Sequence, residues 1–166
     1  MDTFEAIRTV RAVREYEDRA IPEEVKLRIL KAARWTGSSK NFQPWSFIVV
    51  QDRAKLNWLA HSGDYAEHLR HAALAIVIVT ERGIRAGAFD SGRCAQNIMV
   101  AAWNEGVGSC IASMHRQREA ELALELPPEY EVQTVIALGY PAPGPARSPR
   151  KEGRKPMEEL LHWDRW

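Results

Sequence analysis

Four short apolar segments restrict the possible folds of this chain more than any other feature of its sequence. They are WSFIVV at 45–50, LAIVIV at 74–79, SCIAS at 109–113 and VQTVIAL at 132–138. Apolar segments of this length predict β-strands, and none of them is long enough to cross a membrane. The first is a continuous apolar run, which is typical of a strand that is covered on both faces.

Helix-forming patterns precede and separate these segments. Asp2 is a suitable N-cap for a short helix that ends near Thr9, and Asp52 can cap a helix through Ala60. Pro22 fits the first position of a helix that ends near Trp35. We therefore expect helices in the connections between the strands.

A longer helix is predicted from Asp90 to Glu105, with Gly106 as its C-terminal stop. It is apolar on most of its circumference, so it should lie at the centre of the fold. The remaining predicted elements are an extended charged segment and two short helical pieces, at 10–20, 64–72 and 118–126.

Length and charge exclude several classes of protein. A chain of 166 residues predicts one domain, residues 1–166, and a formal net charge of +1 predicts neither a nucleic-acid binder nor an acidic tail. The N-terminus has early charges and no apolar stretch of signal-peptide length, so we expect a cytoplasmic protein. Cys94 and Cys110 each lie in an apolar context, which favours buried reduced thiols over a disulfide.

The C-terminal part of the sequence differs in composition from the rest. Residues 141–156 are rich in proline and basic residues, which predicts an irregular arm. Apolar residues return after it, at Leu160, Leu161, Trp163 and Trp166. We expect this arm to dock, either on its own body or on a second copy of the chain.

Basic residues cluster near both ends of the chain. One cluster is Arg8, Arg11 and Arg14, and the other is Arg150, Lys151, Arg154 and Lys155. Arginine suits a phosphate because its planar fork gives paired charge-assisted hydrogen bonds. The sequence has no GxGxxG and no GxxxxGK[ST] motif, so it supports neither a Rossmann nor a P-loop site. Taken alone, the clusters also fit solvated surfaces.

Five motifs in register suggest a family. They are FEAIRTVRAVREY, SSKNFQPWSFIVV, AQNIMVAAWNEGVGSC, VIALGYP and GRKPMEELLHW, and together they span nearly the whole chain. This pattern resembles the nitroreductase family of FMN-dependent, NAD(P)H-linked oxidoreductases. The resemblance implies an α+β fold, a three-layer α-β-α sandwich with a mixed, mostly antiparallel sheet. It also implies a homodimer with FMN at the subunit interface and a C-terminal arm that docks on the partner.

The resemblance assigns the early basic motif to the cofactor. Arg11, Ala12, Val13 and Arg14 would hold the FMN phosphate and ribityl chain, with Arg14 near the N1–O2 edge of the ring. A cation there would stabilise negative charge on the reduced ring. Val10 and Ala12 stand where relatives usually carry Arg and Ser, which removes two expected phosphate contacts.

A polar loop and a short strand complete the implied site. In the loop, the resemblance assigns flavin contacts across the subunit interface to Ser38, Ser39, Asn41 and Gln43, although a capped turn would use Ser and Asn equally well. The strand would place backbone N–H groups of the residues 111–114 beside the flavin, namely Ile111, Ala112, Ser113 and Met114. Arg154 corresponds to a family arginine at the phosphate, whereas Glu152 replaces a residue that is often basic.

The implied activity is ping-pong hydride transfer from NADH or NADPH, through the flavin, to a nitroaromatic, quinone or similar small-molecule acceptor. The flavin carries the chemistry, so no catalytic side chain is assigned. Alternatives are a relative with another reaction (dehalogenation, flavin breakdown or substrate oxidation), a flavin-binding protein without turnover, and a nucleic-acid binder that uses the basic arm.

Three further histidines are candidates for a role beside this site. His68 and His71 have a spacing that metal ligands can have, but no further ligands complete a set, so we expect surface or partner-facing residues and no metal. His115 fits either the start of a helix or the wall of a substrate pocket, and the helix start is the preferred interpretation.

Overall fold

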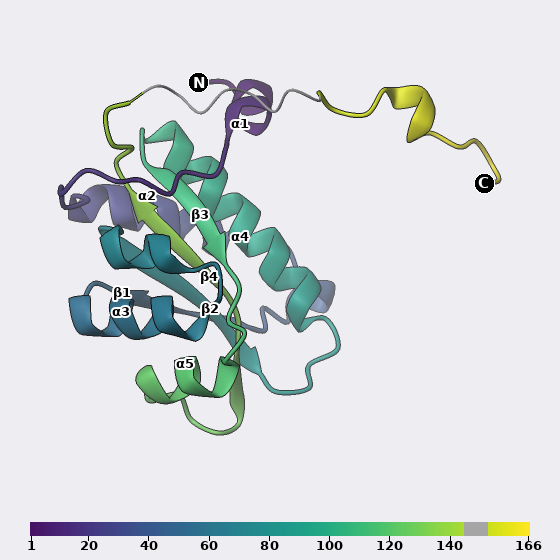
Figure 1. The fold of residues 1–166 in the computed structure, drawn as a ribbon. Coiled ribbons are helices and arrows are strands. Elements are labelled where there is room, and N and C mark those ends of the chain that lie inside the picture. The colour runs from purple at the N-terminus through teal and green to yellow at the C-terminus, as the bar shows by residue number, and fades with distance from the viewer. Residues whose placement is uncertain (145–152) are drawn as a thin grey trace.

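The structure is a computed structural model that describes residues 1–144 and 153–166. Its centre is a four-stranded antiparallel sheet with the order β1-β2-β4-β3 (Figure 1). The strands are β1 (Trp45–Val50), β2 (Leu74–Glu81), β3 (Gly108–Ala112) and β4 (Tyr130–Gly139). All four predicted strands are therefore present.

Helices cover both faces of the sheet. The helices α2 (Glu23–Arg34) and α4 (Gly87–Asn104) pack on one face, where Ile76 and Ile78 of β2 are buried. The other face carries α3 (Arg53–Ser62), the short helix η2 (Glu67–His71) and α5 (Gln117–Ala123), and it buries Val77 and Val79. Alternate residues of β2 thus enter opposite cores, as the period of a strand requires. The expected three-layer α+β sandwich is confirmed.

The prediction that β1 is covered on both faces is confirmed in part, because Phe47 packs against one core and Val50 is buried in the other. β1 is an edge strand that pairs only with β2, and Ser46 and Val49 are exposed. A continuous apolar run cannot distinguish an edge strand from a central one, because it reports which faces are covered and not how many strands pair alongside. The sheet strands pair antiparallel, and a parallel contribution comes from an isolated bridge between Ala12 and Ser109.

Most helix signals in the sequence were correct. Asp2 caps α1 (Thr3–Thr9) and Asp52 caps α3, each by accepting a backbone N–H in the first turn. Gly106 follows α4 with a φ of +74°, which suits glycine. Two boundaries shifted: Pro22 is the N-cap of α2 rather than its first residue, and α4 begins before Asp90, at Gly87.

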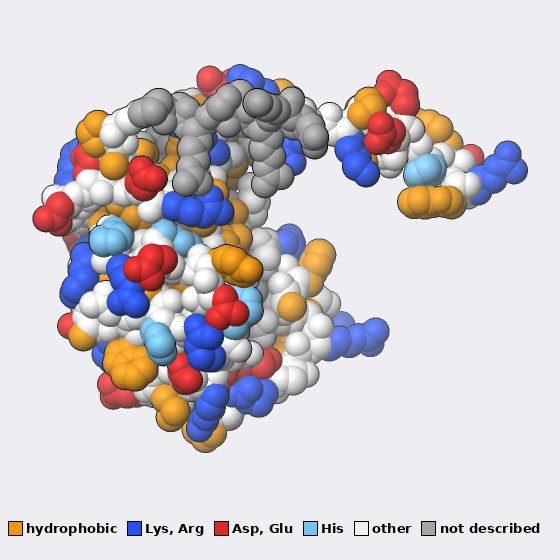
Figure 2. Space-filling view, in the orientation of Figure 1, with side chains coloured by type: hydrophobic (Ala, Val, Ile, Leu, Met, Phe, Trp, Pro, Cys, Tyr) orange, Lys and Arg blue, Asp and Glu red, His pale blue; other side chains and the backbone are white. Residues whose placement is uncertain are grey.

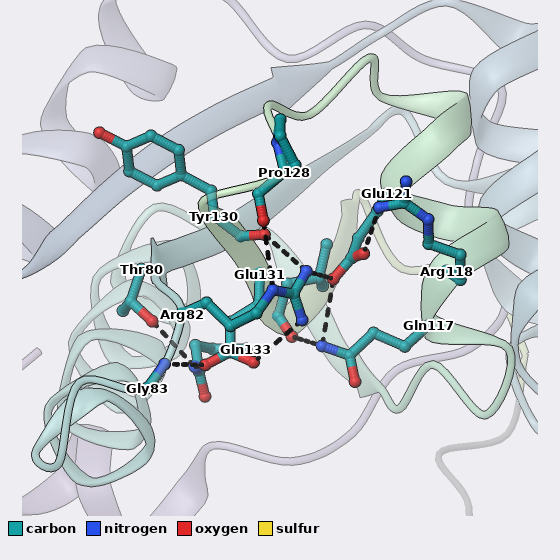
Figure 3. Close-up of polar contacts among 11 residues, drawn as sticks. Thr80, Arg82, Gly83, Gln117, Arg118, Glu121, Pro128, Tyr130, Glu131 and Gln133 are labelled. Carbon is teal, nitrogen blue, oxygen red and sulfur yellow. Dashed lines mark hydrogen bonds and ion pairs between the residues drawn. The ribbon is translucent and has the colours of Figure 1, made fainter.

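A buried carboxylate fixes α5 against the end of the sheet (Figure 3). Glu121 is 2% exposed, and it accepts hydrogen bonds from Arg82 at 3.0 Å and from Arg118 at 3.3 Å. Arg82 follows β2 directly and also donates to the carbonyl oxygen of Tyr130 at 2.8 Å. The network therefore joins the end of β2, the start of β4 and α5.

The C-terminal arm does not dock on its own body. Residues 153–166, including the short helix η3 (Met157–Glu159), are exposed throughout, and the yellow segment projects away from the sandwich in Figure 1. Trp163 is 79% exposed and Trp166 is 99% exposed. Arg150, Lys151 and Glu152 lie outside the described residues. Of the two docking modes expected from the sequence, only docking on a second copy is left as a prediction.

The cysteine prediction is confirmed. Cys94, in α4, and Cys110, in β3, are both free and buried. Both cysteine side chains belong to the buried apolar core.

Candidate functional site

An extended segment before α2 crosses the end of the sheet beside β3. We call this segment, residues 10–16, the strap. The backbone N–H of Val13 in the strap donates to the carbonyl oxygen of Ser109 at 2.8 Å. Two glycines allow this close approach. A Cβ on Gly108 would lie 2.7 Å from the side chain of Val13, and one on Gly139 would lie 2.7 Å from the ring of Tyr16. The glycines therefore let the strap lie directly on the sheet and fix the position of Arg14.

A cavity of about 760 Å³ opens beside the strap. Its walls come from the strap, from the turn before η2 and η2 itself, and from the end of β3 with the residues that follow. The lining residues are Arg14, Glu15, Asp64, Tyr65, Glu67, His68, His71, Ile111, Ala112, Ser113 and His115. The face that carries η2 and α3 shows histidines scattered among acidic and basic side chains (Figure 2).

Arg14 is the residue of the cavity with the clearest electrostatic role. Its guanidinium makes no ion pair or hydrogen bond with residues 1–144 or 153–166. Burial raises the pKa of Tyr16 and of Cys110, against the opposing effect of Arg14. Burial, and then Arg14, lower the pKa of His68. Arg14 therefore has no paired carboxylate among the described residues, and its guanidinium could bind an anion.

His68 adds an unpaired polar atom to the cavity wall. The residue is 6% exposed, and its Nε2 is buried without a hydrogen-bond partner in the described part of the chain. A buried polar atom without a partner costs free energy. The prediction that His68 is a surface or partner-facing residue was wrong, because η2 turns its side chain inward.

The structure brings together four of the residues predicted from the sequence. Arg14, Ile111, Ala112 and Ser113 all line the cavity. Met114 comes next in the chain but packs against the apolar core instead. Ser113 and Met114 donate their backbone N–H groups to no described residue, so these donors are free where β3 ends.

The rest of the early motif lies outside the cavity. Arg11 lies over the ring of Trp103, with its guanidinium carbon 5.6 Å from the ring centroid. Ala12 and Val13 attach the strap to Ser109 through the parallel bridge and the hydrogen bond. Within one chain, these three residues hold Arg14 in place and do not line the cavity.

The predicted polar loop forms a tight turn before β1, with several residues in the left-handed backbone region. The hydroxyl of Ser38 accepts the backbone N–H of Gln43 at 2.8 Å, which is the capped turn that the sequence left open. Ser39 begins the short helix η1 (Ser39–Asn41), and Lys40, Asn41 and Gln43 all have positive φ. None of the loop residues lines the cavity of its own chain. Arg154, on the arm, is also outside it and exposed.

Sequence reasoning missed most of the far wall of the cavity. Its polar residues come from the short helical piece before β2 and from the turn after β3. The missed residues are Glu15, Asp64, Tyr65, Glu67, His68, His71 and His115. The spacing of His68 and His71 is the available signal, but by itself it fits a surface feature equally well. For His115 the preferred helix start was wrong, since α5 begins at Gln117 and His115 lines the cavity.

Two classes of site find no support in the described residues. Among residues 1–144 and 153–166, no three His, Cys, Asp or Glu side chains are grouped as a metal ion would require. Within the same ranges, no helix has both the length and the apolar character needed to cross a membrane.

Comparisons with known proteins agree with the geometry. A family model described as the nitroreductase family matches residues 7–63 and 57–140. A Methanothermobacter thermautotrophicus protein with the provisional name NADH dehydrogenase/NAD(P)H nitroreductase is 34% identical over 153 residues, which cover 87% of this chain and 80% of the relative. A Vibrio harveyi NADPH-flavin oxidoreductase is 28% identical over 90% of this chain and 70% of its own length.

Solved structures have the same architecture. An FMN-dependent nitroreductase from Clostridium difficile superimposes with a TM-score of 0.85 at 26% identity, covering 99% of this chain and 100% of the other. The NADPH:FMN oxidoreductase from Vibrio harveyi, solved in complex with NAD+, gives a TM-score of 0.86 at 26% identity and covers 99% of this chain and 77% of the other.

Proposed function

The chain belongs to the nitroreductase family and is an oxidoreductase enzyme, and from this premise we propose that it is an FMN-dependent oxidoreductase with a small-molecule acceptor. Its electron donor is NADH or NADPH, and its acceptor is a nitroaromatic compound, a quinone or a similar molecule. For a quinone, the overall reaction converts NAD(P)H, one proton and the quinone into NAD(P)+ and the hydroquinone.

The observation that carries the proposal is the unpaired Arg14 in the wall of a large cavity. A volume of about 760 Å³ is within the usual range of pockets for ligands of cofactor size. Beside the cavity lie the backbone N–H groups of Ser113 and Met114, which donate to no described residue. A cation and hydrogen-bond donors suit the pyrimidine half of a flavin, which is rich in carbonyl oxygens and ring nitrogens.

Within this proposal, the bound FMN supplies the hydride-accepting ring. Arg14 stabilises the negative charge that develops during reduction, since a fixed cation in a partly enclosed site stabilises such charge without reorganising. Ile111, Ala112, Ser113 and Met114 bind the ring edge through backbone groups. The glycines beneath the strap hold Arg14 at a constant position.

We further propose that two chains share each site. Ser38, Ser39, Asn41 and Gln43 do not line the cavity of their own chain, and the arm that carries Arg154 is exposed. A homodimer would bring the loop of one chain to the cavity of the other and would cover the apolar residues of the arm. Arg11, Ala12, Val13 and Arg154 would then lie on the phosphate side, and residues 1–166 would form a single FMN-binding domain.

The experiment that tests this function uses the purified full-length chain. We expect a flavin absorbance spectrum that bleaches when NADH or NADPH is added without oxygen. Arg14→Gln should weaken FMN binding by at least about tenfold, because a charge-assisted contact is lost. Arg85→Gln, at an exposed arginine outside the cavity, is the matched control and should change FMN affinity less than about twofold.

Two outcomes would overturn the proposal. One is a wild-type chain that binds no added FMN, or whose bound FMN neither nicotinamide reduces. The other is equal FMN affinity in Arg14→Gln and Arg85→Gln, which would remove Arg14 from the site.

A further inference from the structure

Two connecting segments are packed tightly against each other beside the cavity. One is residues 63–66, between α3 and η2, and the other is residues 113–116, between β3 and α5. A Cβ on Gly63 would lie 2.5 Å from the carbonyl oxygen of Ser113 and 2.7 Å from the Cβ of Ala66. The backbone of Gly63 is extended, with a φ of −124° and a ψ of 135°, which any residue can adopt. Glycine is therefore required at this position for space and not for conformational freedom.

This close contact fixes the direction of one peptide group. The described residues contain no cis peptide bond, and in a trans peptide the C=O and the following N–H point in opposite directions. Because the carbonyl oxygen of Ser113 faces Gly63, the N–H of Met114 points away from Gly63. That N–H donates to no described residue. The contact thus presents an unused donor in a fixed direction.

Arg116 ties the same two segments together through its backbone and its side chain. Its backbone N–H donates to the carbonyl oxygen of Ser62 at 2.9 Å. Its guanidinium donates to the carbonyl oxygen of His61 at 3.0 Å and to the carboxylate of Asp64 at 2.6 Å. In return, the backbone N–H of Asp64 donates to Nδ1 of His115 at 3.1 Å. A planar guanidinium that serves several acceptors loses little entropy for each hydrogen bond, so the two segments behave as one unit.

We call Gly63 and Arg116 the clip. Neither residue lines the cavity, whereas Ser113 does, so the clip can act on a ligand only through the backbone that it holds. All of its contacts are made within one chain. They therefore do not depend on what a second chain adds to the cavity.

We propose that Gly63 and Arg116 are positioning residues for the flavin, and that they hold the N–H of Met114 where it donates to N5 of the oxidised ring. The inference rests on the proposed function. There, Arg14 serves the side of the ring that becomes negative on reduction, which is the side of N1 and O2. The backbone donors are then left with the acceptors of the other side, N5 and O4. Hydrogen bonds to the ring nitrogens are one of the means by which a protein tunes a bound flavin.

The alternative is that the clip only joins α3 to α5 and stabilises the fold. In that case a change in the clip would weaken the binding of every flavin equally. A role in positioning a donor for N5 predicts a selective loss, because only a flavin that has an acceptor at this position would be affected.

The test compares the binding of FMN with that of 5-deaza-FMN, in which a C–H group replaces N5. Flavin-free wild type, Gly63→Ala and Arg116→Met are titrated with each oxidised flavin, so no turnover is involved. Arg118→Met is the matched control for Arg116→Met, since Arg118 lies two residues further along the chain and pairs with Glu121 at 3.3 Å instead. Ile29→Val, in the core on the opposite face of the sheet, is the control for a general loss of stability.

We expect wild type to bind FMN at least about fivefold more tightly than 5-deaza-FMN, which corresponds to one hydrogen bond. In Gly63→Ala and Arg116→Met this preference should fall to within about twofold, since the donor is no longer held in place. Arg118→Met and Ile29→Val should keep the wild-type preference.

Equal affinity of wild type for the two flavins would overturn the proposal, as would a wild-type preference in a folded clip variant. If Gly63→Ala does not fold, Arg116→Met decides alone, because Arg116 does not belong to the buried core. Failure of the proposed function would appear differently, as a wild-type chain that binds neither flavin.

Discussion

Arg14 and His68 face the same cavity, but only one of them could be predicted from the sequence. Arg14 belongs to a basic motif whose register with four other motifs pointed to a cofactor. His68 belongs to a short polar piece before β2, where a buried and an exposed histidine have the same local pattern. Its burial results from η2 packing over the sheet and beside the strap, which is a long-range effect that local spacing does not encode.

His68 also predicts a pH dependence of stability. Burial, and next Arg14, lower the pKa of His68 in the folded chain below the ordinary value of 6.5. As the pH falls through the ordinary value of 6.5, His68 binds a proton in the unfolded chain but not yet in the folded chain, so the free energy of unfolding decreases. The stability that neutral His68 contributes is therefore complete above the ordinary value and is lost as the pH falls below it.

The variant His68→Gln should lack this component. We expect its free energy of unfolding to vary less with pH than that of wild type between about pH 7 and pH 5. Urea denaturation of FMN-free protein at several pH values would measure both slopes. Parallel slopes for the two proteins would show that His68 does not titrate differently on unfolding.

Among the elements, the strap and β1 illustrate two limits of sequence reasoning. The extended character of residues 10–20 was predicted, but its contact with β3 was not, because the two segments are far apart in the chain. β1 was placed correctly along the chain, yet its position at the edge of the sheet was missed. In both cases the local pattern defined the element, and the pairing of distant segments decided its surroundings.

The strap gives a prediction about Gly108. In Gly108→Ala the new methyl group would lie 2.7 Å from Val13, so the strap must move. Overpacking of this kind typically costs about 1–3 kcal/mol. We expect a matching decrease in the free energy of unfolding, and about tenfold weaker FMN binding because Arg14 moves with the strap.

Gly92→Ala is the matched control for this change. Gly92 is in α4, and a Cβ there meets nothing within 4 Å. Alanine should stabilise the helix by up to about 1 kcal/mol and leave FMN binding unchanged. Urea denaturation and fluorescence titration with FMN test both variants. Wild-type FMN affinity in Gly108→Ala would contradict the role assigned to the strap.

For the whole molecule, the sequence predicted the layers of the sandwich through the family resemblance rather than through periodicity. The four strands and most helices followed from apolar runs and caps, but the order β1-β2-β4-β3 requires pairings that no single segment specifies. The two sides of the proposed site are Arg14 and the loop of Ser38 and Asn41. They cannot form one site within a single chain, because this loop does not line the cavity that contains Arg14.

The exposed arm should hold two chains together. Burying a large apolar side chain contributes roughly 1.5–3 kcal/mol, and the arm presents five of these, Met157, Leu160, Leu161, Trp163 and Trp166. We therefore expect a chain that ends at Gly153 to dimerise at least about 100-fold more weakly than the full chain. Sedimentation equilibrium over a range of concentrations would measure this.

The matched control keeps the arm and changes only its charge. Glu158→Gln with Glu159→Gln alters two exposed residues of η3 without removing apolar surface, so dimerisation should stay close to wild type. A truncated chain that dimerises as well as the full chain would exclude the arm from the interface.

The turn before β1 has a consequence for how quickly two chains could combine. Lys40, Asn41 and Gln43 adopt a left-handed backbone that glycine would accept more easily, and the hydroxyl of Ser38 braces the turn. A segment that is already fixed in an unusual shape has little entropy left to lose when a neighbour arrives. Encounter of two chains can therefore proceed as the meeting of preformed surfaces, without a slow local folding step.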